Sequence, residues 1–145
     1  MAKIEKSIEI NAPPEKIWPM LQWERLPEWH TEFKKIEVTS KDKYKVGSTV
    51  HEVIEVGGTE REMDAEITEF TENEKVAWRT TGGAFTASGT FALSPTEAGT
   101  KVSQTMDYEL PYSVFGKLID KLRVHKAIDE SYEVALKKLK DMIEK

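Results

Sequence analysis

The feature that most restricts the fold of this 145-residue chain is a change in the spacing of its apolar residues at Pro111. Between residues 46 and 110, apolar and polar residues alternate in several short runs, which is typical of strands with one buried face. After Pro111, apolar residues recur every three or four positions, which is the spacing of one helix face. The order predicts an antiparallel meander followed by one helix of about thirty residues.

Two Gly-Gly pairs separate the alternating runs and predict hairpins with two-residue loops, because both turn positions can then take a positive φ. A turn at Gly57-Gly58 sets Val56 opposite Thr59 and places the apolar residues of both strands on one face. A turn at Gly82-Gly83 sets Trp78 opposite Ala87, a large ring against a methyl group. The full set of expected facing pairs is Val56/Thr59, Ile54/Arg61, Glu52/Met63, Val50/Ala65, Thr80/Phe85, Trp78/Ala87 and Val76/Gly89.

The start of the chain predicts a strand followed by two short helices. Ile4, Ile8 and Ile10 share one parity, as in a half-buried strand. The stretch NAPPEKIW follows, in which Asn11 or Ala12 is expected to cap a helix and the prolines occupy its first turn. A second brief helix is expected in WERLPEWH, and prolines keep both helices short.

Together these elements predict an α+β helix-grip fold in a single domain over residues 1–145. A curved antiparallel sheet of about six or seven strands wraps around the long C-terminal helix, and the two short helices close one end. Strand positions expected to face inward include Val46, Val102 and Leu110. The helix face expected to be buried consists of Phe115, Leu118, Leu122, His125, Tyr132, Leu136, Leu139 and Ile143.

Composition excludes several classes of function. The chain has 26 acidic and 21 basic residues and a net charge of −5, which argues against nucleic acid as a partner. It has no cysteine, and the N-terminal residues resemble no signal peptide, so a cytoplasmic location is expected. No apolar run is long enough to predict stable membrane insertion. His30, His51 and His125 lack metal-binding spacing, so we expect no metal and no cofactor.

Several short motifs follow one another along the whole chain: NAPPEKIW, LPEWH, YKVGS, a Glu/Lys-rich turn before VAWRTTGG, AGTKV, and DYELP ahead of the long helix. This order resembles the START-like (SRPBCC, helix-grip) superfamily, and within it the polyketide cyclase/dehydrase-like branch. The resemblance implies a cavity between the sheet and the long helix that holds a hydrophobic small molecule or lipid. It implies no catalytic motif, because the superfamily has none in common.

Three functions therefore remain open at this point. The first is binding of a hydrophobic small molecule or lipid, the second is a cyclase or dehydratase reaction, and the third is a protein-interaction module of the chaperone-activator type. The expected ligand-binding residues are Trp29, Phe33, Val50, Glu52, Ile54, Arg61, Met63, Ile67, Trp78, Thr80, Phe85, Phe91, Gln104, Met106, Tyr108, Phe115, Ile119, Leu122 and His125.

Polar residues on the predicted inner face are the candidates for chemistry. His125, one turn before Asp129, is either a general base or a histidine satisfied by Asp129 or by a strand hydroxyl. Glu52 and Arg61 are diagonal neighbours that form either an ion pair inside the cavity or a polar pair at its mouth. Three roles remain open for them: an acid/base pair with Glu52 as the catalytic base, an anchor for a ligand carboxylate through the Arg61 guanidinium, or a structural ion pair near the sheet edge. Gln104 either orients a ligand carbonyl or bonds to Thr80 or a buried water. His51 is expected to face solvent, and His30 to line the cavity entrance.

Overall fold

The computed structural model describes residues 2–56, 58–110 and 118–145 of the chain. The first part of the chain forms one strand and four short helical segments: β1 Ala2–Ile10, α1 Pro14–Ile17, η1 Trp18–Leu21, η2 Trp23–Arg25 and α2 Leu26–Trp29. The remaining elements are β2 Phe33–Val38, β3 Thr49–Val56, β4 Thr59–Thr71, β5 Lys75–Gly83, β6 Thr86–Pro95, β7 Thr100–Glu109 and α4 Leu118–Glu144.

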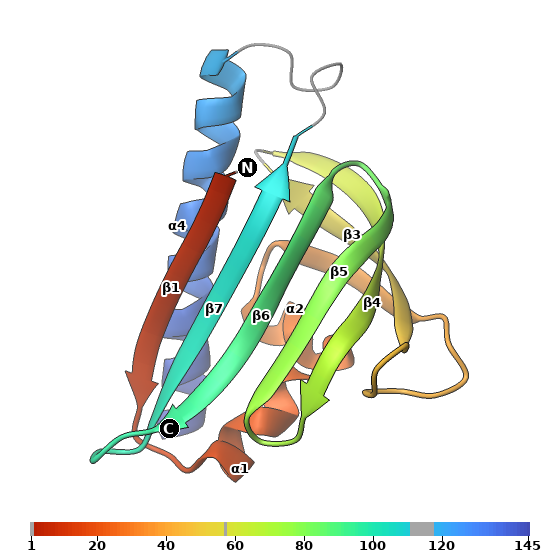
Figure 1. Cartoon of the computed structure of the whole chain (residues 1–145). Coiled ribbons are helices and arrows are strands. Elements are labelled where there is room, and N and C mark those ends of the chain that lie inside the picture. The colour runs from red at the N-terminus through yellow and green to blue at the C-terminus, as the bar shows by residue number, and fades with distance from the viewer. Residues whose placement is uncertain (1, 57, 111–117) are drawn as a thin grey trace.

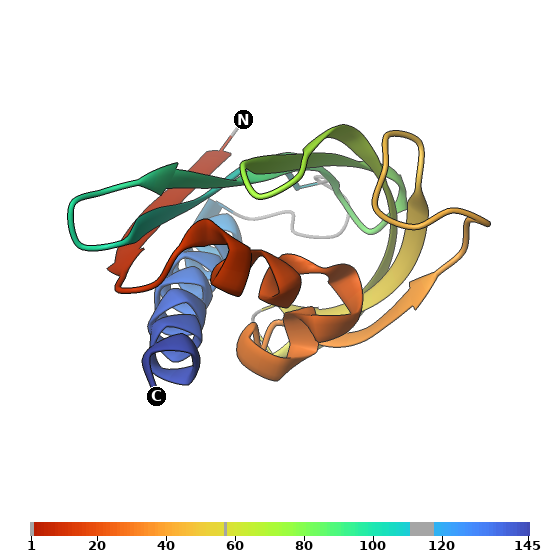
Figure 2. The same cartoon turned by 90° about the horizontal axis from the view of Figure 1, so that it is seen from below.

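The strands form one antiparallel seven-stranded sheet in the order β1-β7-β6-β5-β4-β3-β2. Figure 1 shows α4 lying along the β1 and β7 side of this sheet, with the short helices near its lower end. Seen from below, the sheet curves around α4 and the short helices (Figure 2). The predicted helix-grip fold is confirmed, including the number of strands and the position of the short helices after the first strand.

The first short helix begins differently from the prediction. Its N-cap is Pro13, which offers no side-chain hydrogen bond, and Pro14 is its first residue. The backbone N–H of Asn11 donates instead to Glu144 Oε2 at the far end of α4, at 2.9 Å. The prediction of Asn11 or Ala12 as the cap is wrong, because two consecutive prolines delay the helix by fixing an extended residue before it.

The register of the β3–β4 hairpin is as predicted, with Val56 opposite Thr59 and Glu52 opposite Met63. The predicted β5–β6 register is wrong by two residues, because Trp78 lies opposite Gly89 and not Ala87.

The glycine pair is the reason for this shift, because it does not form the β5–β6 turn. Gly82 and Gly83 end β5, where they pair with β4, and the turn lies at Ala84 and Phe85. A Cβ on Gly83 would come 2.5 Å from the carbonyl oxygen of Glu62, so the glycine permits a close approach of two backbones.

Two residues expected on the inner face lie outside the core. Val46 is 63% exposed because β3 begins only at Thr49, after a turn at Gly47 with φ +93°. Leu122 is 60% exposed, since the first turns of α4 extend beyond the ends of β1 and β7 (Figure 1). The observed buried face of α4 is Val124, Ile128, Tyr132, Ala135, Leu136, Leu139 and Ile143. Phe115 and the side chains of Leu118 and Ile119 lie outside the described residues.

The core has two apolar clusters that meet at Phe33 and Trp78. One joins the short helices to the C-terminal half of α4 and includes Trp29 and Leu139. The other joins the opposite end of the sheet to the middle of α4 and includes Ile128. The sheet and helix therefore bury each other along most of their length, and the short helices close one end of the interior.

Candidate functional site

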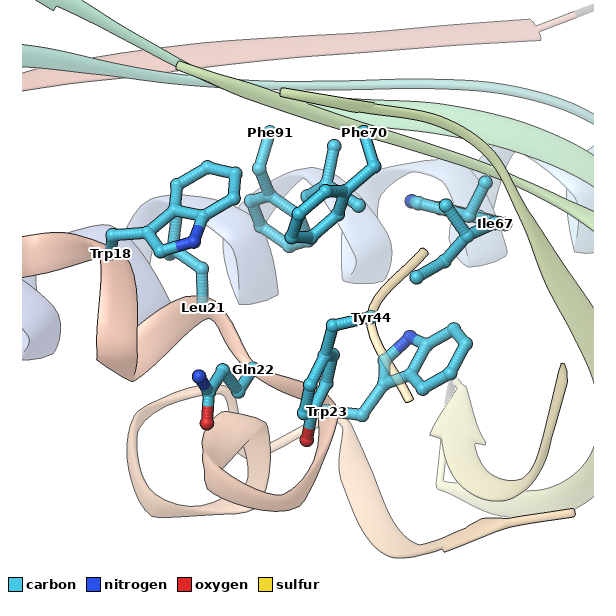
Figure 3. Close-up of a pocket in the computed structure, with 10 residues that line it drawn as sticks. Trp18, Leu21, Gln22, Trp23, Tyr44, Ile67, Phe70 and Phe91 are labelled. Carbon is cyan, nitrogen blue, oxygen red and sulfur yellow. The ribbon is translucent and has the colours of Figure 1, made fainter. Parts of the chain in front are cut away.

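An apolar cavity of about 30 Å³ lies between the short helices and the sheet. Figure 3 shows aromatic side chains converging on it from both sides: Trp18 and Trp23 from the short helices, and Phe70 and Phe91 from the sheet. We call it the aromatic cavity, and its lining residues are Trp18, Leu21, Gln22, Trp23, Tyr44, Ile67, Phe70, Val76, Trp78 and Phe91. Gln22 is the one residue in this list whose side chain is neither aromatic nor aliphatic.

A second cavity, of about 20 Å³, lies next to it and nearer to α4. The two share three aromatic walls, which are Trp23, Trp78 and Phe91. We call the second one the inner cavity, and its lining residues are Trp23, Leu26, Phe33, Glu52, Ala65, Trp78, Phe91, Gln104 and Tyr132. Each cavity has about the volume of one water molecule, so the interior in this structure is closely packed.

Five polar residues meet around the inner cavity, and we call them the polar cluster: His30, Glu32, Glu52, Gln104 and Tyr132. All five are at least nine-tenths buried. Gln104 Nε2 donates to His30 Nε2 at 3.0 Å, and the His30 ring stands edge-on to the Tyr132 ring with centroids 4.9 Å apart. Such a group inside an apolar core is costly unless its atoms are hydrogen-bonded, so each contact matters.

The contacts of the polar cluster leave some atoms unused. Ser131 Oγ donates to Glu32 Oε2 at 3.3 Å, and the Tyr132 hydroxyl donates to the sulfur of Met106 at 3.2 Å, which is a weak acceptor. Gln104 Oε1 and His30 Nδ1 are buried without a hydrogen-bond partner among the described residues. One of these two residues, Gln104, lines the inner cavity, so the cavity wall includes a residue with an unsatisfied acceptor.

Burial changes the protonation of this cluster. It raises the pKa of Glu32 from 4.5 to about 8, with a further contribution from the nearby charge of Glu52. Burial also raises the pKa of Glu52 to about 7 and lowers the pKa of His30 to about 3. At neutral pH the imidazole is neutral, Glu32 is mostly protonated, and Glu52 is close to half ionised.

Of the predicted ligand-binding residues, six line one or both cavities: Phe33, Glu52, Ile67, Trp78, Phe91 and Gln104. Others are packed in the core away from the cavities: Trp29, Val50, Ile54, Met63, Phe85 and Met106. The Trp29 indole N–H donates to the carbonyl of Met20 at 2.7 Å, which ties η1 to α2. The Thr80 hydroxyl forms hydrogen bonds with the backbone of Ala87 at the end of the β5–β6 ladder. Its partner is therefore Ala87, and not Gln104 as one of the predictions had it.

The second catalytic candidate, His125, lies in a different place. Its Nδ1 forms a 2.7 Å hydrogen bond with the hydroxyl of Tyr108, while Asp129 pairs with Lys6 at 3.0 Å. The strand hydroxyl, and not Asp129, therefore satisfies this histidine. His125, Tyr108 and Leu122 border an open groove of about 420 Å³ at the start of α4, away from the residues that line the inner cavity.

The other polar residues predicted on or near the inner face lie in different environments. Glu52 is buried at the inner cavity, whereas Arg61 is half-buried opposite Ile54 and lines neither cavity. His51 lies on the outer face, as predicted, between Asp64 at 2.8 Å and Glu62 at 3.1 Å. His30 was expected at the cavity entrance, and this is wrong because the residue is fully buried at the end of α2.

Sequence reasoning missed several residues of the two cavities and of the polar cluster. Glu32 follows α2 in a turn, a position at which an acidic residue is normally exposed, so no local signal marks its burial. Trp18 and Trp23 were assigned to short helices, but their convergence with Phe70 depends on the curvature of the sheet. Tyr44 lies in the long β2–β3 connection, where no periodic pattern exists.

Two other kinds of feature are not found in the described residues. None of the helices in the described part of the chain is long and apolar enough to cross a membrane. Within the same residues, no three His, Asp or Glu side chains are grouped so as to hold a metal ion.

Comparison with known proteins places the chain in a family. Residues 1–144 match the model of the family described as polyketide cyclase / dehydrase and lipid transport. An uncharacterised 17.2 kDa protein from the melC2-rnhH intergenic region of Streptomyces lincolnensis is 35% identical over 124 residues, which cover 84% of this chain and 78% of that protein.

Solved structures share the fold over nearly the full length. TTHA0849 from Thermus thermophilus has a TM-score of 0.81 at 26% identity, covering 98% of this chain and 97% of that one. A START superfamily protein from Mycobacterium smegmatis has a TM-score of 0.77 at 21% identity, with the same coverage. The chain belongs to the polyketide cyclase / dehydrase and lipid transport family and has its START-like fold.

Proposed function

We propose that this protein binds a hydrophobic small molecule or lipid in the space between the sheet and α4. The observation that carries the proposal is the aromatic cavity, which continues across Trp23, Trp78 and Phe91 into the inner cavity and its polar cluster. An apolar wall with a few polar groups at one end is typical of sites for small molecules. Family membership supports the same function.

The ligand enters, in this proposal, by displacing side chains of the aromatic cavity. Tyr44 and Trp23 are in contact, with ring centroids 6.0 Å apart, and Tyr44 lies in the connection between β2 and β3. Tyr44 has φ +57°, a left-handed conformation that is unfavourable for a residue with a Cβ. In this proposal an outward movement of the connection opens the aromatic cavity toward solvent.

The test is a titration with N-phenyl-1-naphthylamine, a neutral apolar probe whose fluorescence rises in apolar surroundings. We expect saturable binding by the wild-type protein, and an affinity about fivefold weaker in Phe70→Ser, which removes a ring from the cavity wall. Val134→Ser is the matched control, because Val134 is 56% exposed on the outer face of α4. Equal binding by all three proteins, or no binding by the wild type, would refute the proposal.

A cyclase or dehydratase activity is the second candidate, and one observation favours it. Glu52 and Gln104 line the same inner cavity, and burial raises the pKa of Glu52 to about 7, near the optimum for a general acid or base. His125 does not share this cavity. The activity predicts that Glu52→Ala abolishes turnover of a bound polyketide-like substrate while His125→Ala does not, and turnover that survives Glu52→Ala excludes it.

The third candidate, a protein-interaction module, has less support. The large apolar side chains that are exposed in the described residues are single and separated: Val46, Leu122, Val134 and Met142. Isolated exposed residues of this kind are normal on monomer surfaces and do not form a docking patch.

A further inference from the structure

We propose that the polar cluster selects ligands whose apolar body carries one positively charged amine, held by Glu52 and by Gln104 Oε1 in the inner cavity. This inference rests on the binding function proposed above and adds the chemical class of the ligand. In this arrangement the apolar body occupies the aromatic cavity, and the amine lies at the end nearest α4.

Gln104, which lines the inner cavity, offers an unused acceptor, Oε1. The other unused atom of the polar cluster, His30 Nδ1, carries the hydrogen of the neutral ring, and His30 is not among the residues that line this cavity. Gln104 is 3% exposed, its Nε2 is engaged by His30, and its Oε1 has no partner among the described residues. Glu52 is 7% exposed and lines the same cavity. An ammonium group has three donors and no acceptor, so it matches two convergent acceptors better than a carbonyl or a carboxylate does.

The charges around Glu52 favour a cation. Glu32 and Glu52 both lie close enough to Tyr132 to raise the pKa of its hydroxyl, so the polar cluster holds two acidic groups near one another. His30 is neutral because burial lowers its pKa, so it adds no positive charge to the polar cluster. His51 and Asp64 act on Glu52 from the outer face of β3 and β4, and their effects on its charge are opposite.

The nearest basic residue on the same face of β4 is Arg61, which is half-buried and lines neither cavity. An ammonium in the inner cavity donates a charge-assisted hydrogen bond to ionised Glu52, and such a bond is about twice as strong as a neutral one. A ligand carboxylate in the same position would be repelled by ionised Glu52.

The inference predicts a direction for the dependence of affinity on pH. The ammonium binds to ionised Glu52, and burial raises the pKa of Glu52 without ligand to about 7. Below pH 7 most Glu52 is protonated and must lose its proton before the amine binds, which weakens the apparent affinity. Affinity for an amine then rises by about tenfold from pH 6 to pH 8. A neutral ligand with the same apolar body releases no proton and shows no such rise.

The experiment compares three probes that share one apolar body: 2-phenylethylamine, 2-phenylethanol and phenylacetate. Each is titrated by isothermal calorimetry into the wild-type protein at pH 6, 7 and 8. We expect the amine to bind about tenfold more tightly than the alcohol at pH 8, and the acetate to bind most weakly. This comparison needs no variant, so it does not depend on whether substitutions at Glu52 fold.

Variants then assign the effect to the cavity. Glu52→Gln is expected to abolish the rise of affinity with pH for the amine. Glu55→Gln is the matched control, because Glu55 lies on the same strand but faces outward in a salt bridge with Lys34. Its pH dependence should equal that of the wild type.

The outcomes separate this inference from the proposed function. Binding of 2-phenylethanol with equal or weaker binding of the amine, or an affinity for the amine that does not change with pH, overturns the amine selectivity and leaves the binding function intact. Absence of binding by all three probes and by N-phenyl-1-naphthylamine overturns both.

Discussion

The indole of Trp78 on β5 lies directly over Gly89 on β6. A Cβ built on Gly89 would come 2.8 Å from Cζ2 of Trp78 and 2.5 Å from the carbonyl oxygen of Thr105 on β7. Because Trp78 lines both cavities, the absence of a side chain at Gly89 sets the position of the ring that separates them.

Gly89→Ala is therefore expected to destabilise the protein by about 2 kcal/mol or more, because the new methyl group meets backbone on one side and the partly buried Trp78 ring on the other. Thermal or urea unfolding measures the loss. Gly82→Ala is the control, since its Cβ would meet only Asp64 Oδ2, at 3.5 Å, and we expect it to be nearly neutral. Equal effects in the two variants would contradict the packing of Trp78 on Gly89.

The stability of the protein is expected to fall as the pH rises above neutrality. Burial raises the pKa of Glu32 to about 8 and that of Glu52 to about 7, so the folded state holds these protons more tightly than the unfolded state. Their stabilising contribution is complete below pH 4.5 and is lost as the pH rises through these values. Between about pH 6.5 and about pH 9 we expect a loss on the order of 2 kcal/mol in the free energy of unfolding.

His30 acts in the opposite direction, but in a different pH range. Burial lowers its pKa from 6.5 to about 3, so its contribution is present above pH 6.5 and is lost only as the pH falls. Urea unfolding at pH 6.5, 8 and 9 therefore avoids the titration of His30 and leaves the two glutamates together with His51, whose pKa is raised by its hydrogen bonds to Asp64 and Glu62 and whose stabilisation is also lost as the pH rises. The Glu32→Gln/Glu52→Gln double variant should show a clearly shallower decline than the wild type over this range, and a decline as steep as in the wild type would show that groups other than the two glutamates cause it.

His125→Ala is expected to leave binding in the cavities unchanged. The histidine bonds to Tyr108 beside the open groove, so its removal costs about 1 kcal/mol of stability and no affinity for N-phenyl-1-naphthylamine. Thermal unfolding and fluorescence titration measure the two quantities on one sample. A loss of affinity without a loss of stability would instead place His125 in the binding site.

The strands and the long helix could be predicted wherever the spacing of apolar residues within one segment reports its buried face. The alternation through Met63, Ala65 and Ile67, and the helical spacing through Tyr132 and Leu139, each report a buried face directly. The β5–β6 register was not predictable from Gly82 and Gly83 alone, because glycine serves both turns and close backbone contacts. Here the contact of Gly83 with Glu62 explains the pair.

The candidate site was predicted only in part, because its polar residues come from distant positions. Glu52 and Gln104 alternate with apolar neighbours on their strands, so their inward orientation could be read from the pattern. Glu32 and His30 lie in and beside a turn, and they are buried only because α4 packs over them through Ser131 and Tyr132. No local spacing carries that information.

The most direct test of the account is to locate a bound ligand by NMR. Intermolecular NOEs are measured between N-phenyl-1-naphthylamine and the side chains of the isotope-labelled protein. If the ligand binds in the aromatic and inner cavities, NOEs are expected to Ile67 and Phe91 on the sheet and to Tyr132 on α4. Ile67 lines the aromatic cavity, Tyr132 lines the inner cavity, and Phe91 lines both. NOEs confined to outer-face residues such as Thr90 and Thr105, or to the groove at His125, would contradict it.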